Sequence, residues 1–553
     1  MPCGKGSALT RRPFLFFRPR IGSVTLSILT ALYALAILNQ TFWAKAATNL
    51  AGQTTVLVTL AIGLAAAFIA IFVTLSVKYL TKPVLMIFVL AGAASGWFMD
   101  QFGVVIDKEM IRNAAETSGP EAGHLLTSAF VLHIFLVGIL PCLLIAWVKI
   151  SHRPFLHKVG YNMAVIIPSV LVFTGAAYSQ AGTFAFTIRQ HRDWFETLNP
   201  LFPIGSTILY AIGAGEEHGI VAQPLGLDAR VSDAEADIKG LRKPRVTIVV
   251  VGETARASSF QLGGYEQPTN PELSQEDIVY FKDTTSCGTA TAVSVPCMFS
   301  GLGRSNYSHT KGLASENLMD VLSHAGIRTE WWDNNTGSKG MALRIPYKEL
   351  YRTNDPRFCE NGECKDEILL DQLDNWLNSV DHDAVLVLHQ LGSHGPAYYA
   401  RYPDAYRRFT PDCRSSEFSA CHRQEIINAY DNSILYTDHV LATIIHKLKA
   451  QETRIAPSMI YMSDHGESLG EKGLFLHGAP WIVAPAQQTH IPFVLWLGQE
   501  ARAKTARGCW SHQATEPQSH DNLFHTVLGL MQVETKVHDK TKDLYSSCVK
   551  VES

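Results

Sequence analysis

Residues 245–254 read RVTIVVVGET, a short run of apolar, mostly β-branched residues that ends in a glycine and a glutamate. Such a continuous run is typical of a central strand in a parallel sheet, because these strands are covered on both faces. Open α/β sheets bind their ligands at the carboxyl ends of strands. We therefore expect Glu253 to lie at the edge of a site.

Three further short apolar runs are also typical of strands. They cover residues 384–388, 458–462 and 492–497, and the first two lead into HQLGSHGP and SDHGESLGE. Helical patterns lie between these runs, at 366–380 and 423–448. Strands that alternate with helices predict an α/β domain whose sheet is covered by helices on both faces.

The chain before residue 185 has a different composition. Hydrophobic residues make up 47% of the protein, and most of the excess lies in five apolar segments, each close to the ~20 residues that cross a bilayer as a helix. They are residues 21–43, 55–75, 83–99, 125–148 and 161–181. A cleaved signal peptide would account for the first segment, but that segment lacks an obvious small-residue cleavage site and four similar segments follow it. We therefore predict five transmembrane helices.

The predicted organisation has three parts. A membrane domain covers residues 1–183, an interfacial helix and linker cover 184–242, and an outer α/β domain covers 243–553. The middle part starts with an aromatic segment, which is typical of a membrane interface, and becomes polar and glycine-rich from about residue 211. A length of 553 residues agrees with more than one domain.

Charged loops predict which side of the membrane each part occupies. Basic residues gather in the N-terminal tail and in the second and fourth loops, whereas the third loop is acidic. By the positive-inside rule the basic segments are cytoplasmic, so five crossings leave the C-terminal half outside. The basic residues are Lys5, Arg11, Arg12, Arg18, Arg20, Lys78, Lys82, Lys149, Arg153 and Lys158.

Eight of the ten cysteines follow residue 286. An even number in close pairs predicts disulfides between neighbours and an oxidising compartment. A structural zinc cluster is the weaker interpretation, because none of the pairs has Cys-x-x-Cys spacing. Cys3 and Cys142 stand apart and are predicted to be free thiols.

The ends of the predicted strands carry the side chains of a metal site. Glu253, Asp464 and His465 together offer two carboxylates and an imidazole, a mixed set that suits zinc. Each side chain alone has a structural explanation: a helix-cap carboxylate for Glu253, a turn for Asp464 and His465, and core histidines for His394 and His477. Their joint placement after strands of one domain favours a site.

A hydroxyl group is the predicted fourth ligand. Residues 284–300 read TTSCGTATAVSVPCMFS, and in this segment Thr289, Thr291 and Ser294 each offer an oxygen. Zinc would lower the pKa of a bound threonine hydroxyl and create a nucleophile at neutral pH. From Ala292 onward a helix is expected, whose N-terminal amides favour an anionic phosphoryl group. Composition alone does not choose among the three hydroxyls.

Four segments carry a resemblance to a known family. VVVGETAR (249–256), TTSCGTATAVSVPCMFS (284–300), HQLGSHGPAY (389–398) and SDHGESLGEKGLFLHG (463–478) closely resemble segments of the membrane-anchored phosphoethanolamine transferases that modify lipid A, which include the mobile colistin-resistance enzymes. The resemblance covers nearly the whole chain. It implies an outer domain of the alkaline phosphatase/sulfatase type.

The resemblance also assigns roles to residues. It implies that Thr291 is the nucleophile, and that Glu253, Thr291, Asp464 and His465 bind one catalytic zinc. His394 and His477 would contact the substrate phosphate or a second zinc, Lys339 would approach the phosphoryl group, and Asn113, Glu116 and Thr117 of the acidic loop would help to bind lipid. The implied disulfides are Cys287–Cys297, Cys359–Cys364 and Cys413–Cys421, and parity leaves Cys509 with Cys548.

The implied reaction takes phosphoethanolamine from phosphatidylethanolamine to a lipid A phosphate through a covalent threonine intermediate, with one histidine as general acid. The resemblance implies a protein of the bacterial inner membrane with its catalytic domain in the periplasm, and polymyxin resistance as the phenotype. A monomer is the default expectation. The alternatives are another acceptor (core heptose or a periplasmic glucan), phosphoglycerol transfer, or an inactive lipid sensor. A sulfatase is disfavoured because a Cys/Ser-x-Pro-x-Arg motif is absent around Thr291, and a net charge of -3 argues against a nucleic-acid partner.

Overall fold

The computed structural model describes residues 18–151, 154–190, 192–217, 219–232 and 242–550. Cys3, Lys5, Arg11, Arg12 and Arg153, which entered the predictions above, lie outside these ranges. The chain forms two compact units. One contains the residues up to Gly96 together with Leu132–Trp194 and Leu198–Pro200, and the other contains Trp97–Val131, Phe195–Thr197 and the chain from Leu201 onward.

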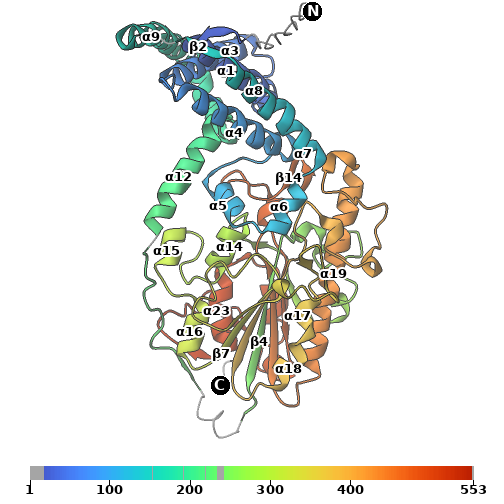
Figure 1. The fold of residues 1–553 in the computed structure, drawn as a ribbon. Coiled ribbons are helices and arrows are strands. Elements are labelled where there is room, and N and C mark those ends of the chain that lie inside the picture. The colour runs from blue at the N-terminus through green and yellow to red at the C-terminus, as the bar shows by residue number, and fades with distance from the viewer. Residues whose placement is uncertain (1–17, 152–153, 191, 218, 233–241, 551–553) are drawn as a thin grey trace, which may run out of the picture. The chain divides into compact units, whose positions relative to one another are not determined.

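The N-terminal region holds the apolar helices. Four helical stretches are long and apolar enough to span a membrane: α3 (Thr54–Thr74), α4 (Thr81–Phe102), the run Ser128–Trp147 and α9 (Phe155–Ser179). A fifth span is formed if α1 (Ser23–Ile37) and α2 (Gln40–Asn49), which meet at a 60° bend, are counted as one. These helices coincide with the five predicted segments, and the run Ser128–Trp147 comprises α7 (Ser128–His133), a π-helical turn η1 (Ile134–Ile139) and α8 (Leu140–Trp147). Figure 1 shows them in the blue to blue-green part of the chain.

The acidic third loop is helical. It contains α5 (Lys108–Glu116) and α6 (Gly119–Leu125), which belong to the same unit as the C-terminal domain. Asp107 caps α5 by accepting a hydrogen bond from the Met110 amide at 2.8 Å, and Ser118 caps α6 through the Glu121 amide.

The expectation of a linker from residue 211 was wrong at its start, because α12 (Leu201–Glu217) continues through the first residues of that segment.

A seven-stranded sheet forms the centre of the C-terminal domain, in the order β5-β15-β12-β4-β11-β7-β8. The strands β12 (Ala456–Ser463), β4 (Arg245–Gly252), β11 (Ala384–His389), β7 (Arg328–Asp333) and β8 (Tyr347–Glu349) run parallel. β15 (Phe493–Leu497) and β5 (Ile278–Phe281) are antiparallel to their neighbours. The expectation that residues 492–497 continue the parallel set was therefore wrong, because an apolar run carries no information on strand direction.

Helices cover both faces of this sheet, as Figure 1 shows. One face packs on α17 (Ile368–Asp371), α18 (Leu373–Asn378) and α19 (Arg423–Lys449), and the other packs on α14 (Thr291–Met298), α16 (Leu318–His324) and α23 (Asp521–Leu530). Both faces of β4 are buried, which explains its continuous apolar run. The single helix predicted over 366–380 is divided into α17 and α18 at Gln372.

The remaining elements are short or connect these layers. The helices are α10 (Ala181–Gln190), α11 (Arg192–Glu196), α15 (His309–Leu313), α20 (Ala486–Thr489), α21 (Gln499–Ala503) and α22 (Cys509–Gln513). The strands are β1 (Arg20–Gly22), β2 (Lys149–Ser151), β3 (Arg230–Val231), β6 (Thr284–Thr285), β9 (Cys359–Glu360), β10 (Glu363–Cys364), β13 (Ser468–Glu471), β14 (Leu474–Leu476), β16 (Gln518–Ser519) and β17 (Val533–Glu534).

Four disulfides close loops in the C-terminal domain: Cys287–Cys297, Cys359–Cys364, Cys413–Cys421 and Cys509–Cys548. Cys142 is a buried free thiol in the described part of the chain.

Loop length predicts which of these disulfides stabilises the fold most. Cys509 and Cys548 are 39 residues apart, whereas Cys359 and Cys364 are 5 apart. Chain-entropy arguments give about 4 kcal/mol for the long loop and about 2 kcal/mol for the short one. We expect replacement of the first pair by serines to lower the free energy of unfolding more than replacement of the second, as measured by denaturation in detergent. An equal or reversed loss would contradict the loop-entropy account.

Candidate active site

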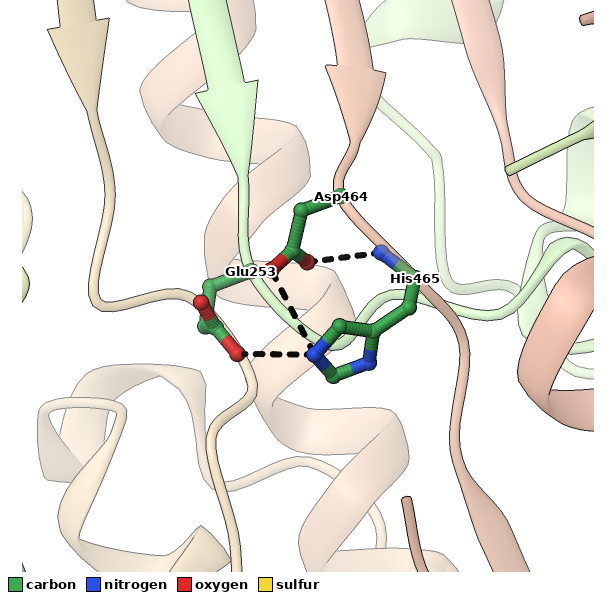
Figure 2. A group of neighbouring side chains, drawn as sticks. All are labelled: Glu253, Asp464 and His465. Atoms are coloured by element: carbon green, nitrogen blue, oxygen red, sulfur yellow. Dashed lines mark hydrogen bonds and ion pairs between the residues drawn. The ribbon is translucent and has the colours of Figure 1, made fainter. Parts of the chain in front are cut away.

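Two neighbouring strands bring three predicted ligands together. In the β4–β12 register Ser463 pairs with Gly252, so Glu253 and Asp464 follow side by side, and the Asp464 amide donates to the Gly252 carbonyl at 2.9 Å. His465 Nε2 lies 3.5 Å from Glu253 Oε1 and 3.3 Å from Asp464 Oδ2. Figure 2 shows the three side chains converging from the strand ends. One ligand atom from each lies within 4.8 Å of the other two.

Of the three candidate hydroxyls, that of Thr291 meets this cluster. Thr291 is the first residue of α14, and its Oγ1 donates to Glu253 Oε2 at 3.0 Å and lies 3.4 Å from His465 Nε2. Thr289 Oγ1 instead donates to the carbonyl of Ala479 at 2.7 Å. Ser294 Oγ is buried and has no hydrogen-bond partner in the described part of the chain. The helix expected from Ala292 begins one residue earlier.

The ligand atoms of Glu253, Asp464 and His465 fit a divalent cation. Asp464 Oδ2 is buried and has no hydrogen-bond donor among the described residues. Burial and the neighbouring Glu253 carboxylate raise the pKa of Asp464 to about 6. Burial alone would raise the pKa of Glu253 as well, but His465, His394 and His477 lower it. Two buried carboxylates side by side repel each other, and a bound cation removes that repulsion.

Glu253 is fixed by its surroundings. Asn335 Nδ2, from the loop after β7, donates to Glu253 Oε2 at 2.8 Å, and the hydroxyl of Thr254 donates to Oε1 at 2.5 Å. Thr254 has a φ of 60°, a strained value for a branched residue. A Cβ on Gly392 would lie 2.6 Å from the Glu253 carbonyl oxygen, so only glycine fits there. These contacts hold the ligand in one orientation.

His394 and His477 lie beside the metal ligands. The ring centroid of His477 is 4.3 Å from that of His465 and 5.4 Å from that of His394. His394 Nε2 is 3.1 Å from Glu121 Oε1 on α6. Burial alone would lower the pKa of His394, but the neighbouring Glu121 carboxylate raises this pKa to about 9. Sequence reasoning missed Glu121, although it lies in the acidic loop that had been singled out.

Lys339 and the residues predicted to bind lipid make contacts with one another. Lys339 Nζ pairs with Glu116 Oε2 at 3.0 Å, and Thr117 Oγ1 donates to the Asn113 carbonyl at 2.9 Å. A cavity of about 390 Å³ lies between α6 and the strand-end loops. Its lining includes Glu121, Asn335, Thr336, Tyr351, Glu363 and His394. This volume is at the lower end of ordinary small-molecule sites.

Glu363 anchors α6 to the loop that carries His394. Its Oε2 lies 2.8 Å from His124 Nε2 of α6 and 3.0 Å from Arg401 Nη1. The Arg401 Nε donates in turn to the carbonyl of His394 at 2.7 Å. Burial alone would raise the pKa of Glu363, but Arg401 and His124 hold it well below its usual value. The carboxylate is therefore the form that the fold requires.

This shift predicts a pH-dependent stability. A depressed folded-state pKa stabilises the protein above the unfolded pKa of about 4.5, and that stabilisation disappears as the pH falls through the folded value. We expect Glu363→Gln to lower stability by about 1.5–3 kcal/mol at pH 7, the range for hydrogen bonds to charged groups. Melting curves should show a difference that shrinks only a little between pH 7 and pH 4 and falls away at more acidic pH, as the pH approaches the depressed folded value. A difference that is already lost between pH 7 and pH 4 would contradict the assignment.

Known proteins match both regions of the chain. A family model described as phosphoethanolamine transferase EptA/EptB matches residues 64–213, and one described as sulfatase matches residues 245–533. Phosphoethanolamine transferase EptA of Escherichia coli strain K12 is 37% identical over 546 residues, which are 97% of this chain and 99% of that protein. The chain belongs to the phosphoethanolamine transferase family.

Two further comparisons agree with this assignment. Phosphatidylethanolamine transferase Mcr-1 of Escherichia coli is 34% identical over 542 residues, 95% of this transferase and 98% of the relative. The solved structure of the integral membrane phosphoethanolamine transferase EptA of Neisseria meningitidis matches with a TM-score of 0.92 and 33% identity. That match covers 96% of this chain and 100% of the other. The resemblance inferred from four segments, and the sulfatase-like fold it implied, are confirmed.

Proposed function

We propose that this transferase moves phosphoethanolamine from phosphatidylethanolamine to a phosphate of lipid A through a covalent intermediate on Thr291. The observation that carries the proposal is the position of the Thr291 hydroxyl oxygen in the buried Glu253–Asp464–His465 cluster. This oxygen lies 3.0 Å from Glu253 Oε2 and 3.4 Å from His465 Nε2. The donor follows from the printed name of Mcr-1. A relative named Kdo(2)-lipid A phosphoethanolamine 7''-transferase, 31% identical over 51% of this chain, supports an acceptor that contains lipid A. The choice of a phosphate as the attacking group follows from the family resemblance.

Zinc held by Glu253, Asp464, His465 and Thr291 would lower the pKa of the Thr291 hydroxyl and attract the phosphoryl oxygens. Thr291 loses its proton to water and its oxygen attacks the phosphorus of the donor. The bond to Thr291 forms, the bond to the diacylglycerol oxygen breaks, and the departing oxygen takes a proton from a histidine. Lys339, His394 and His477 are assigned to the phosphoryl oxygens, because positive charge and hydrogen-bond donors stabilise this transition state.

In the second half of the reaction an oxygen of the acceptor phosphate attacks the same phosphorus. A new phosphorus–oxygen–phosphorus link forms, the bond to Thr291 breaks, and the Thr291 oxygen takes back from water the proton that it lost in the first half. The proton that the acceptor phosphate brings restores the histidine. The product carries a positively charged ethanolamine amine near the lipid A phosphate. A membrane that contains this modified lipid A has a less negative surface and binds cationic peptides such as polymyxin more weakly.

We also propose a location for each part of the chain. We assign residues 1–183 to the inner membrane, 184–242 to an interfacial helix and linker, and 243–553 to a periplasmic catalytic domain of a monomeric protein. The four disulfides support an oxidising compartment. Confinement of the enzyme to the membrane that holds both lipid substrates would raise their effective concentration.

Mass spectrometry of lipid A tests the acceptor. Cells that produce the wild type should carry lipid A with added phosphoethanolamine, whereas cells that produce Thr291→Ala should not. The cells that produce Thr291→Ala should therefore be more sensitive to polymyxin. Unmodified lipid A in both strains would overturn the acceptor assignment. Modification of core heptose or of a periplasmic glucan in the same strains would identify the alternative acceptor, and added phosphoglycerol would identify a different donor.

A further inference from the structure

The C-terminal domain exposes very few large apolar side chains. Among the described residues from 242 to 550, only Leu343, Ile482, Val483 and Val549 are exposed. Ile482 is the most exposed of the four at 79%, and Val483 follows it directly at 38%. Single apolar residues on a surface are common, but two adjacent ones on a domain that buries nearly all the others indicate a contact surface.

The loop that carries these two residues is fixed beside the site. It covers residues 477–485 and begins with one of the two site histidines. The Gly478 amide donates to the carbonyl of Thr289, and the Thr289 hydroxyl donates to the carbonyl of Ala479, both at 2.7 Å. Thr289 precedes the proposed nucleophile by two residues. The position of the loop is therefore linked to that of the nucleophile segment.

The loop has the composition of a segment that faces lipid. Residues 478–489 read GAPWIVAPAQQT and contain no charged side chain. The guanidinium of Arg304 lies over the ring of Trp481, with Cζ 4.6 Å from the ring centroid. Arg304 Nε is buried and has no hydrogen-bond partner among the described residues. A tryptophan and a cation next to exposed aliphatic side chains are typical of the boundary between lipid tails and headgroups.

We propose that the loop tip Trp481–Val483 contacts the surface of the lipid bilayer, with Ile482 and Val483 among the lipid tails, and that the lipid donor reaches the site along this loop. The supply of the donor rests on the proposed function, whereas the lipid contact itself does not. The chain has four helical stretches that can span a membrane, or five if the bent pair counts as one, so a lipid surface is always available to it.

The small size of the apolar surface favours lipid over a protein partner. Two adjacent aliphatic side chains and part of a tryptophan offer far less area than the about 800 Å² that each partner of a standard protein–protein interface buries. Lipid tails need no such area, because single aromatic and aliphatic side chains already gain free energy by leaving water for a bilayer.

Photo-crosslinking identifies what covers the loop. Full-length protein with Ile482→p-benzoylphenylalanine is reconstituted in vesicles of phosphatidylethanolamine and phosphatidylglycerol and irradiated, and its peptides are analysed by mass spectrometry. We expect phospholipid on the peptide that contains position 482. Leu171→p-benzoylphenylalanine, at a 66% exposed position of the membrane-spanning helix α9, is the positive control. Val549→p-benzoylphenylalanine, at the exposed valine outside this loop, should give no lipid adduct.

A charged side chain at the same position tests the supply of the donor. The full-length wild type and Ile482→Asp are compared on phosphatidylethanolamine in vesicles and on water-soluble p-nitrophenyl phosphoethanolamine. We expect Ile482→Asp to raise KM for the vesicle lipid by roughly 10-fold or more, because a carboxylate enters lipid at a high cost in hydration. For the soluble ester kcat/KM should stay within about twofold of the wild type. Ile482→Leu and Val549→Asp should behave like the wild type on both donors.

The other outcomes overturn the proposal or one part of it. If position 482 gives no lipid adduct while position 171 does, lipid does not cover the loop, and a crosslink to a second copy of the chain would assign this surface to self-association. If Ile482→Asp affects both donors alike, or neither, the loop does not supply the donor. A wild type that transfers from neither donor but forms the lipid adduct would overturn the proposed function and leave the lipid contact standing.

Discussion

Replacement of Thr291 by alanine is expected to abolish transfer, with kcat at least about 10³-fold below that of the wild type, the scale seen when a nucleophile is removed. The Thr291 oxygen is the hydroxyl that meets Glu253 and His465, so alanine leaves the cluster without its attacking group. Binding of the donor should change little, because the cavity beside His394 keeps its lining. Initial rates of diacylglycerol release from phosphatidylethanolamine measure the effect.

Two neighbouring hydroxyls supply matched controls for this variant. Ser294→Ala removes a buried hydroxyl without a described partner, and Thr289→Ser keeps the hydrogen bond to Ala479, so both should retain most of the activity. Thr291→Ser keeps an oxygen at the right position and should retain part of it. Wild-type rates in Thr291→Ala, or loss confined to Ser294→Ala, would contradict the assignment of the nucleophile.

Loss of the metal is expected to have a comparable effect. Asp464→Asn removes one of the two buried carboxylates that face each other, and so weakens cation binding at a site where burial makes each charge important. We expect the purified variant to contain little zinc and to work at least about 10²-fold more slowly than the wild type. Chelation of the wild type should reproduce the loss, and added zinc should restore it.

A thermal measurement separates metal binding from activity. A cation that binds only the folded protein raises its stability by about 2.7 kcal/mol at a hundredfold excess over Kd. Zinc should therefore raise the melting temperature of the chelated wild type but not that of Asp464→Asn. Asp438→Asn is the matched control, because Asp438 is also buried but accepts hydrogen bonds from the amides of Glu272 and Leu273. Zinc content and activity that survive in Asp464→Asn would contradict the metal site.

Much of the site was predictable because its ligands follow strands with a clear apolar signal. β4 and β12 are buried runs, and Glu253, Asp464 and His465 come directly after them. β7 was missed because its sequence, RTEWWD, contains charged residues whose partners appear only in the fold, such as Lys348 for Glu330. Asn335, which follows β7 and binds Glu253, was missed with it.

Contacts between distant segments were beyond the reach of sequence patterns. Glu121 and His394 are joined only because α6 lies beside the strand-end loops, and no local periodicity reports such a contact. Glu467 was visible within the SDHGES segment, but its pairing with His477 depends on the register of a hairpin. The choice of Thr291 over Thr289 and Ser294 first depended on resemblance, and the distances now supply an independent geometric reason.

The most direct test of the account is the covalent intermediate itself. The full-length protein is incubated with phosphatidylethanolamine in the absence of lipid A, and its peptides are analysed by mass spectrometry. The account predicts one phosphoethanolamine group on Thr291, formed together with diacylglycerol and lost when lipid A is added. An adduct on Thr289 or Ser294 with none on Thr291, or diacylglycerol release without any adduct, would contradict it.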